Sequence, residues 1–124
     1  MISLDSTLMV LQVRTATAIN TTEPVAHVWY YDVPLQAKTE NEEYRKFLTR
    51  TVMTNTTDIT ICAAPLLQGV TRNIISICVN NRSLDTEIFT FSTFDGTTRY
   101  PLITRSALTL EAIWYEDYGG WQNY

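Results

Sequence analysis

Lysine and histidine are scarce in this chain of 124 residues, which has two lysines, Lys38 and Lys46, and one histidine, His27. Seven arginines are scattered along the sequence, and the formal net charge is −4. Proteins that bind nucleic acid neutralise its phosphates with clustered lysine and arginine, so this charge balance disfavours a nucleic-acid partner. No apolar run approaches the roughly 20 residues that span a bilayer, so we expect no membrane partner.

Residues for catalysis and for metal binding are also few. His27 has no partner at the spacing of a metal site or of a catalytic base, and we expect it to be structural. Two pairs of neighbouring acids stand out, Glu42–Glu43 and Glu116–Asp117. Adjacent residues of a strand point to opposite faces, so neither pair converges on a substrate. We therefore predict a protein that is not an enzyme and that binds no cofactor and no metal.

Glycine and proline number only four each, which excludes a flexible or collagen-like chain. The abundant residues are threonine, with twenty copies, isoleucine with ten, valine with eight, and fourteen aromatic residues. Such β-branched and aromatic side chains suit the half-buried surface of a sheet. We predict an all-β protein, a single-domain antiparallel β-sandwich over residues 1–124. We expect it to be jelly-roll-like or immunoglobulin-like, with seven or eight short strands.

Alternation of apolar and polar residues predicts where the strands lie. They are expected at 7–17, 25–33, 48–53, 58–64, 73–80 and 107–115. In the strand 25–33, period two places His27, Trp29 and Tyr31 on one face. The other face, which carries Ala26 and Val28, is apolar as well. We expect a strand that is buried on both sides, or one whose second face meets a partner.

Two tight turns predict hairpins near the C-terminus. Asp95-Gly96 suits a two-residue hairpin loop, because both residues tolerate positive φ. This turn sets Phe94 opposite Thr97, Phe91 opposite Tyr100 and Phe89 opposite Leu102. The four large side chains of the last two pairs then lie on one face. Pro101 in the returning strand cannot donate to a ladder, so we expect that strand to lie at an edge or Pro101 to point its missing donor outward. A second turn at Gly119-Gly120 sets Tyr118 opposite Trp121 and Tyr115 opposite Tyr124.

The segment 35–50 holds the only dense run of charge in the chain. Asn41 suits the cap of a short helix, whereas the alternation from Phe47 to Met53 suits a strand. We favour a charged surface loop or arm that leads into a strand at 48–53. Our hypothesis is that this segment is an interaction arm, because it concentrates charge in an otherwise charge-poor chain.

The two cysteines, Cys62 and Cys78, lie symmetrically about residue 70. A symmetric hairpin between them would place them nearly opposite each other, so the spacing allows a cross-strand disulfide as well as two free thiols. The first residues lack the basic start and apolar stretch of a secretory signal, and we expect assembly in a reducing cytosol. That compartment favours buried free thiols.

Aromatic side chains are the remaining candidates for a functional surface, because Trp and Tyr give large contact area at low entropic cost. They are also ordinary core residues, and that alternative stays open. With the charged segment, the candidate interface residues are Trp29, Tyr31, Glu42, Tyr44, Arg45, Phe47, Tyr118 and Trp121.

The order of several motifs resembles that of a family of small tailed-bacteriophage virion proteins. The motifs are a Thr/Asn-rich strand ending in Ala63-Ala64-Pro65, the turn at Asn80-Asn81, the run Asp95-Gly96-Thr97-Thr98, and an aromatic close at Gly119-Gly120-Trp121. The chain departs from the family near Ala107 to Glu111, where a glycine-containing turn is common and this chain has no glycine.

The resemblance implies a structural, non-enzymatic β-sandwich of the virion, assembled in the cytoplasm of the bacterial host. Its expected role is that of a capsid decoration (cement) protein or a head-to-tail neck component that acts through protein–protein interfaces. The expected partners are further copies of itself, as a homo-oligomer with a trimer as the first expectation, and the major capsid, neck or tail proteins. The alternative is a carbohydrate-binding or tail-fibre-associated module that uses its aromatic residues as stacking platforms.

Overall fold

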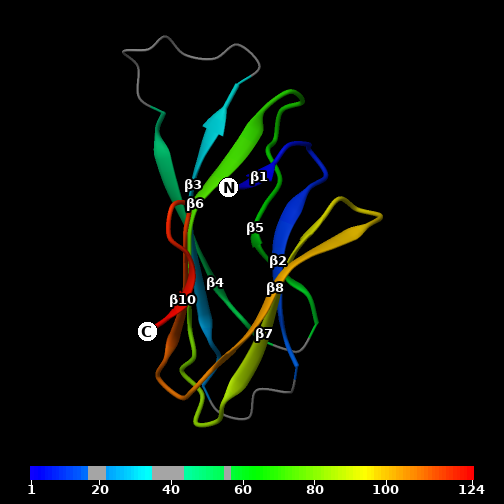
Figure 1. Cartoon of the computed structure of the whole chain (residues 1–124). Helices are drawn as coiled ribbons and strands as arrows, with labels where there is room; N and C mark the ends of the chain where they lie inside the picture. Colours follow the sequence, from blue (N-terminus) through cyan, green and yellow to red (C-terminus); the bar gives the residue numbers. More distant parts are fainter. Residues whose placement is uncertain (17–21, 35–43, 55–56) are drawn as a thin grey trace.

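The computed structural model describes residues 1–16, 22–34, 44–54 and 57–124, and these residues form a β-sandwich of two antiparallel sheets (Figure 1). The prediction of an all-β sandwich is confirmed, with ten strands in the described residues instead of seven or eight. Within those residues, no helix is long and apolar enough to cross a membrane.

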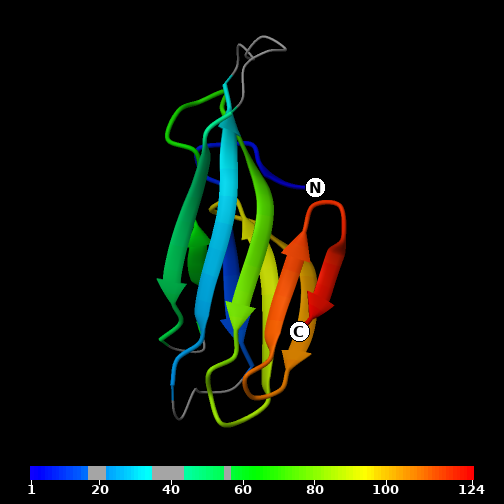
Figure 2. The same ribbon diagram turned by 90° about the vertical axis from the view of Figure 1, so that its left-hand side faces the viewer.

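Sheet A is the larger layer and has the strand order β10-β9-β6-β3-β4, with β1 beside β6. Its strands are β1 (Ile2–Leu4), β3 (Val25–Val33), β4 (Lys46–Val52), β6 (Thr71–Asn80), β9 (Ala112–Glu116) and β10 (Gly120–Asn123). Its outer face is turned toward the viewer in Figure 2.

Sheet B is the second layer and has the strand order β5-β2-β7-β8. Its strands are β2 (Val10–Thr15), β5 (Ile59–Cys62), β7 (Glu87–Phe94) and β8 (Arg99–Ala107). Among the described strands, only β3–β4, β7–β8 and β9–β10 are consecutive strands of one sheet that pair with each other. Every other connection between described strands passes from one sheet to the other, so residues of one functional face come from distant parts of the chain.

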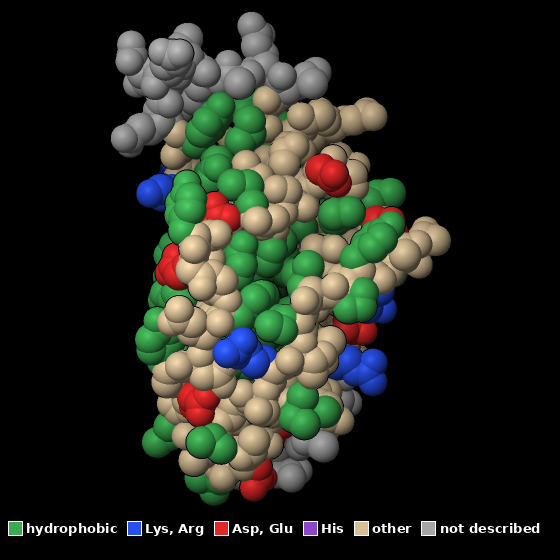
Figure 3. Space-filling model, in the orientation of Figure 1, with side chains coloured by type: hydrophobic (Ala, Val, Ile, Leu, Met, Phe, Trp, Pro, Cys, Tyr) green, Lys and Arg blue, Asp and Glu red, His purple; other side chains and the backbone are tan. Residues whose placement is uncertain are grey.

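The core lies between the two layers and follows from the alternation of each strand. Fully buried side chains from both sheets fill it, among them Leu11, Val13, Val28, Ile77, Phe89, Phe91 and Ile113. In the view along the edge between β8 and β10, apolar side chains appear between the layers (Figure 3). Arg105 and Asn123 close this edge, since the Arg105 guanidinium donates to the Asn123 amide oxygen, and the amide of Asn123 donates to the Ser106 carbonyl.

Arg72 joins the two layers at one end of the sandwich. Its guanidinium donates to both carboxylate oxygens of Asp32, at 2.7 and 2.9 Å, and to the carbonyl of Ala63 at 2.9 Å. The same guanidinium lies 4.2 Å from the ring centre of Tyr30. Because Arg72 belongs to β6 of sheet A and Ala63 follows β5 of sheet B, this buried side chain fastens one layer to the other.

Most strand predictions hold, and β3 occupies the predicted residues 25–33. The strands predicted at 48–53, 58–64 and 73–80 occur with ends shifted by about two residues, and the one predicted at 7–17 is shorter. The short β1 was not predicted. Residues 35–43 lie outside the described residues, and 46–52 form the strand that was one of the alternatives for this region.

The predicted register of the β7–β8 hairpin is wrong. The turn spans Asp95 to Thr98, because the Asp95 carboxylate accepts the backbone N–H groups of Thr97 and Thr98 at 2.9 and 2.7 Å. Phe94 therefore pairs with Arg99, and an irregularity between Phe91 and Ser92 shifts the pairing again. The expected common face does not exist, since Phe89 and Phe91 are buried while Tyr100 and Leu102 are exposed. Pro101 lies in an edge strand, which was one of the two alternatives expected for it.

The strand predicted at 107–115 is also wrong in its first half. The chain turns at residues 108–111, where the Glu111 N–H donates to the Leu108 carbonyl at 3.0 Å, and β9 begins at Ala112. Leu110 has a φ of 64° in this turn, although it is not glycine. In the β9–β10 hairpin, Trp121 lies opposite Tyr115 instead of Tyr118. Tyr124 bonds to Ala112 in both directions at 2.8 Å.

Cys62 and Cys78 are free thiols, and the symmetric hairpin that would have placed them opposite each other does not form. The reason is topological, since β5 belongs to sheet B and β6 to sheet A. Cys62 lies in the core, whereas Cys78 alternates with the core residues Ile77 and Val79 and so points to the outer face of sheet A.

Candidate functional site

The outer faces of the two sheets differ in chemistry. The outer face of sheet B is mainly polar, with Gln12, Arg14, Thr60, Thr90, Thr104 and Ser106 beside the apolar residues Val10, Ile88, Phe94 and Pro101. The hydroxyls of Thr90 and Thr104 lie 3.1 Å apart across β7 and β8. Some of the many threonines therefore lie on the solvent-facing side of sheet B.

The outer face of sheet A carries a surface of half-buried rings, here called the aromatic face, which consists of His27, Trp29, Tyr31, Tyr44 and Trp114. The ring centres of His27 and Trp29 are 6.0 Å apart, and those of Trp29 and Trp114 are also 6.0 Å apart. Tyr31 stacks on Tyr44 with 5.6 Å between the ring centres. These separations are within the range of favourable ring pairs.

Small side chains on β6 allow the rings of β3 and β9 to meet. β6 lies between these strands, and it places Ser76 opposite Trp29 and Cys78 opposite both His27 and Trp114. Strands two apart are about 10 Å from each other, so indole rings approach across β6 only where its side chains are short. Burial under these rings raises the pKa of the Cys78 thiol above its usual value.

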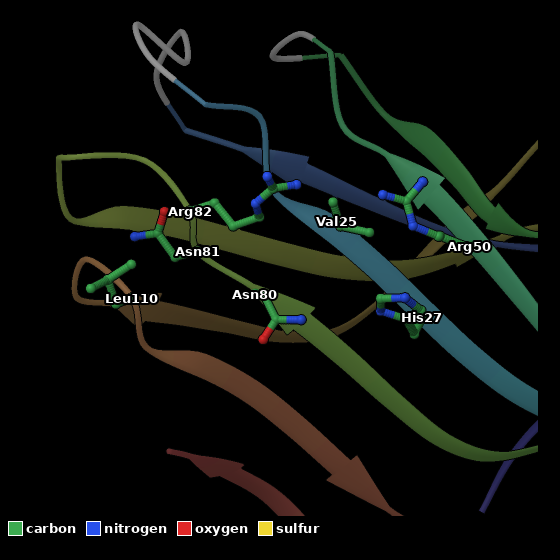
Figure 4. Close-up of a pocket in the computed structure, with 7 residues that line it drawn as sticks. All are labelled: Val25, His27, Arg50, Asn80, Asn81, Arg82 and Leu110. Carbon is green, nitrogen blue, oxygen red and sulfur yellow. The ribbon is translucent and has the colours of Figure 1, made fainter.

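A hollow of about 320 Å³ adjoins the aromatic face at the end of sheet A where β6 ends, and it is here called the arginine hollow. His27 and Arg50 are paired on β3 and β4, and Asn80 on β6 lies opposite Val25. Figure 4 shows these side chains on neighbouring strands, with Arg82 and Leu110 from the adjoining loops.

A buried asparagine fixes the two loops that border the arginine hollow. The Asn81 amide donates to the carbonyls of Asp85, at 2.9 Å, and Ala107, at 3.0 Å, and its oxygen accepts the Ser83 N–H at 3.1 Å. The Asn81 carbonyl accepts the Leu110 N–H at 2.9 Å. The β6–β7 loop and the β8–β9 turn are thus bonded together, and this places Arg82 and Leu110 on either side of one buried residue.

The arginine hollow is basic, and none of the described residues that line it is acidic. Within the part of the chain that the structure describes, ion pairs join Met1 to Asp117, Arg72 to Asp32 and Arg99 to Asp58. Neither Arg50 nor Arg82 takes part in one of these pairs. In a protein with a net charge of −4, the hollow therefore presents two guanidinium groups whose charge no described carboxylate neutralises.

The structure brings three of the candidate interface residues together, since Trp29, Tyr31 and Tyr44 all belong to the aromatic face. Phe47 lies on the opposite side of β4, where it stacks on Tyr30 at 5.4 Å, and the Arg45 guanidinium lies 5.1 Å from its ring.

The remaining candidates lie elsewhere. Trp121 packs 4.6 Å from Phe91 and 5.0 Å from Tyr115, against the core. Tyr118 is fully exposed in the β9–β10 turn, away from the other rings. Glu42 lies outside the described residues.

Sequence reasoning assigned no function to His27 and did not identify the arginine hollow. Arg50 and Arg82 are distant in sequence and have no motif around them, so only the pairing of β4 with β3 and of β3 with β6 brings them to one end of sheet A. Trp114 was detectable as an aromatic residue, but its contact with Trp29 across β6 was not.

No group of three histidine, cysteine, aspartate or glutamate side chains that suits a metal ion occurs in the described ranges. Comparisons of the chain with models of protein families, with curated proteins and with solved structures gave no match.

Proposed function

We propose that this protein is a non-enzymatic structural component of a tailed-bacteriophage virion, a capsid decoration or head-to-tail neck protein, that binds its partners through the aromatic face. The observation that carries the proposal is the contrast between the two outer faces. Threonine and other polar side chains predominate on the outer face of sheet B, whereas half-buried Trp and Tyr rings cover the centre of sheet A. Aromatic residues at the centre of a patch are typical of interfaces that contribute binding energy.

The packing of the rings supports a role in contact. Trp29 is held between His27 and Trp114, and Tyr31 is held by Tyr44, so the face is ordered before a partner arrives. A preordered surface loses little side-chain entropy on binding. The exposed Leu48 lies opposite Trp29 on β4 and extends the apolar surface toward the edge of sheet A.

The virion assignment is supported by the sequence motifs, and the fold is compatible with it. A small sandwich with one adhesive face is suited to repeated contacts in a symmetric assembly, because one surface patch serves every copy. The proposed partners are further copies of the chain, with a trimer as the first expectation, and the major capsid, neck or tail proteins. The place of action is the virion.

The test is to remove the rings from the aromatic face and measure assembly. Trp29→Ala combined with Trp114→Ala should abolish the oligomer in size-exclusion chromatography with light scattering, and should remove the protein from purified particles. The matched control is Thr90→Ala with Thr104→Ala on the outer face of sheet B, which should leave both readouts unchanged. A wild-type protein that is monomeric at all concentrations and absent from particles would contradict the proposal.

The second candidate function is carbohydrate binding, and a specific observation favours it. The paired rings of Trp29 and Trp114 lie beside the polar side chains of the arginine hollow, and stacking platforms next to hydrogen-bond donors suit a sugar ring. Glycan binding that quenches tryptophan fluorescence in a monomeric protein, and that is lost in Trp29→Ala, would favour this function. Trp121 is a poor choice for that test, because its ring packs on Phe91.

A further inference from the structure

We propose that the arginine hollow binds a carboxylate group, presented by an acidic side chain with apolar neighbours in the protein segment that docks on the aromatic face. The inference deepens the proposed function and rests on it. It names the chemistry of the partner at one end of the contact surface.

The donors of the hollow match a carboxylate. Arg50 and Arg82 supply planar guanidinium forks, and such a fork binds the two oxygens of a carboxylate through parallel hydrogen bonds. The His27 ring and the Asn80 amide add single donors from the neighbouring strands. The four groups come from β3, β4, β6 and the loop after β6, so they surround a space instead of lying along one strand (Figure 4).

The unpaired positive charge of the hollow indicates that its ligand is an anion. Within the described ranges, the hollow has no acidic lining residue and no ion pair includes Arg50 or Arg82. The chain has 13 acidic residues, yet none of the described ones forms an ion pair with Arg50 or Arg82. A carboxylate from a partner would supply the missing charge, and the attraction would orient the approach of that partner.

The rim of the hollow indicates that the carboxylate belongs to a protein segment. Leu110 lines the hollow and is 85% exposed. Leu84 and Leu108, in the two loops that carry Arg82 and Leu110, are 76% and 62% exposed. The Thr109 hydroxyl donates to the Ser83 carbonyl, so the segments that bear these leucines are adjacent. A free phosphate or a uronic acid has no apolar group for this rim, whereas a peptide with leucines beside an acidic residue has one.

Backbone strain at Leu110 supports a role for its side chain. Its φ of 64° lies in the left-handed region that glycine adopts without cost, and a leucine there is strained. The exposed side chain contributes nothing to the core that would offset this strain. A contact with a partner accounts for a leucine at a position where glycine would fold more easily.

The experiment measures binding of short capped peptides to the full-length protein at fixed pH. The probe contains one glutamate between two leucines in a glycine–serine frame, and its partner peptide has glutamine in place of the glutamate. His27 is the only histidine, so its ring signals in a ¹H–¹³C NMR spectrum are assigned without ambiguity and report on the hollow and on the adjoining end of the aromatic face. We expect saturable shifts of these signals with the glutamate peptide and none with the glutamine peptide.

Variants connect the binding to the two arginines. Arg50→Gln and Arg82→Gln should each weaken binding by about tenfold or more, because each removes hydrogen bonds to a charged group. Leu110→Gly should weaken it less. Arg14→Gln, which removes one positive charge from the outer face of sheet B, should leave the affinity unchanged.

Three results would overturn the proposal. They are equal binding of the glutamine peptide, unchanged affinity in both hollow variants, and binding of inorganic phosphate or glucuronate without binding of the glutamate peptide. The assembly assay with Trp29→Ala and Trp114→Ala reports separately on the proposed function. Peptide binding without any assembly would contradict the proposed function alone, and assembly that does not depend on Arg50 or Arg82 would contradict the carboxylate site alone.

Discussion

Arg72 connects the two layers of the sandwich through its side-chain contacts. Its buried guanidinium pairs with Asp32, bonds to the carbonyl of Ala63 in the other layer and covers the ring of Tyr30. Buried charges of this kind are costly to leave unpaired. The carboxylate of Asp32, 30% exposed, stays within reach of water when the arginine is removed, so the cost of breaking the pair should be at the lower end of the usual range.

Arg72→Met should lower the free energy of unfolding by about 3 kcal/mol, since it removes the pair with Asp32 and the bond to Ala63 together. Arg72→Lys keeps the charge but lacks the planar fork, so it should recover only part of the loss. Urea unfolding followed by tryptophan fluorescence measures both variants. A lysine variant as stable as the wild type would show that charge alone, and not the shape of the guanidinium, holds the two layers.

Asp95 gives the protein a specific dependence on acid. The backbone N–H groups of Thr98 and Thr97 hold the pKa of the Asp95 carboxyl below its usual value of 3.8. A carboxyl whose pKa is lower in the folded state stabilises the fold above its unfolded pKa, and this contribution is lost as the pH falls through the folded pKa. Urea midpoints measured between about pH 2 and pH 6 should therefore fall more steeply in the wild type than in Asp95→Asn.

The asparagine variant is a fair comparison, because its side-chain oxygen still accepts the N–H groups of Thr97 and Thr98 but does not titrate. A parallel pH dependence of both proteins in this range would contradict the assignment. An NMR titration of the Asp95 carboxyl would measure its pKa directly, and a value above 3.8 would also contradict the assignment.

Among the elements, β3 was predictable to the residue, whereas the hairpins were predictable only in part. In β3, the alternation of Ala26 and Val28 with His27 and Trp29 sets the two faces without help from other strands. In the β7–β8 hairpin, side-chain hydrogen bonds of Asp95 lengthen the turn, and an irregularity at Phe91 shifts the register. Neither feature is visible in a pattern of apolar residues, and each displaces the residues that follow it.

The turn at 108–111 was also not predictable from the local pattern, because the alternation of Leu108 and Leu110 with polar residues is typical of a strand. Bonds to a buried residue in another loop, Asn81, impose the turn instead. Sequence reasoning did not predict this turn, because the position with positive φ is occupied by Leu110 and not by glycine.

Leu110→Gly should therefore raise the free energy of unfolding by about 1 kcal/mol, because it removes the strain of a positive φ. The matched control is Leu108→Gly. Leu108 is also exposed, but Leu110 is the one described residue other than glycine that has a positive φ. This control should gain nothing and should lose a few tenths of a kcal/mol, because glycine increases the freedom of the unfolded chain. Thermal or urea unfolding distinguishes them, and a destabilised Leu110→Gly would mean that the leucine side chain supports the fold.

At the scale of the whole molecule, the assignment of strands to sheets was the part that local sequence did not determine. β5 and β6 are consecutive and both apolar, yet they belong to different layers, and the arginine hollow depends on β4, β3 and β6 lying side by side. Pairings between distant segments are set by how the whole core closes, not by the residues of one strand. The fold class was predictable from composition, and the aromatic face in part from β3, but the hollow was not.

The passage of the chain from one layer to the other at most connections implies that the two sheets unfold together, because neither keeps a complete core alone. Cys62 reports on this cooperativity, since it is buried in the core and burial raises the pKa of its thiol to about 11. A thiolate is the reactive form, so native Cys62 should be almost inert near neutral pH. In Cys78→Ser, a thiol reagent should modify the protein only as fast as global unfolding exposes Cys62.

The modification rate, extrapolated to low denaturant, should then give the same free energy of opening as urea unfolding. The denatured wild-type protein, without added reductant, should release two thiols, in agreement with two free cysteines. A modification rate in Cys78→Ser far above that expected from global unfolding would mean that β5, the short edge strand of sheet B, detaches by itself. That result would mean that the sandwich does not unfold as one cooperative unit. The edge strand β5 would then open while the aromatic face of sheet A stays folded.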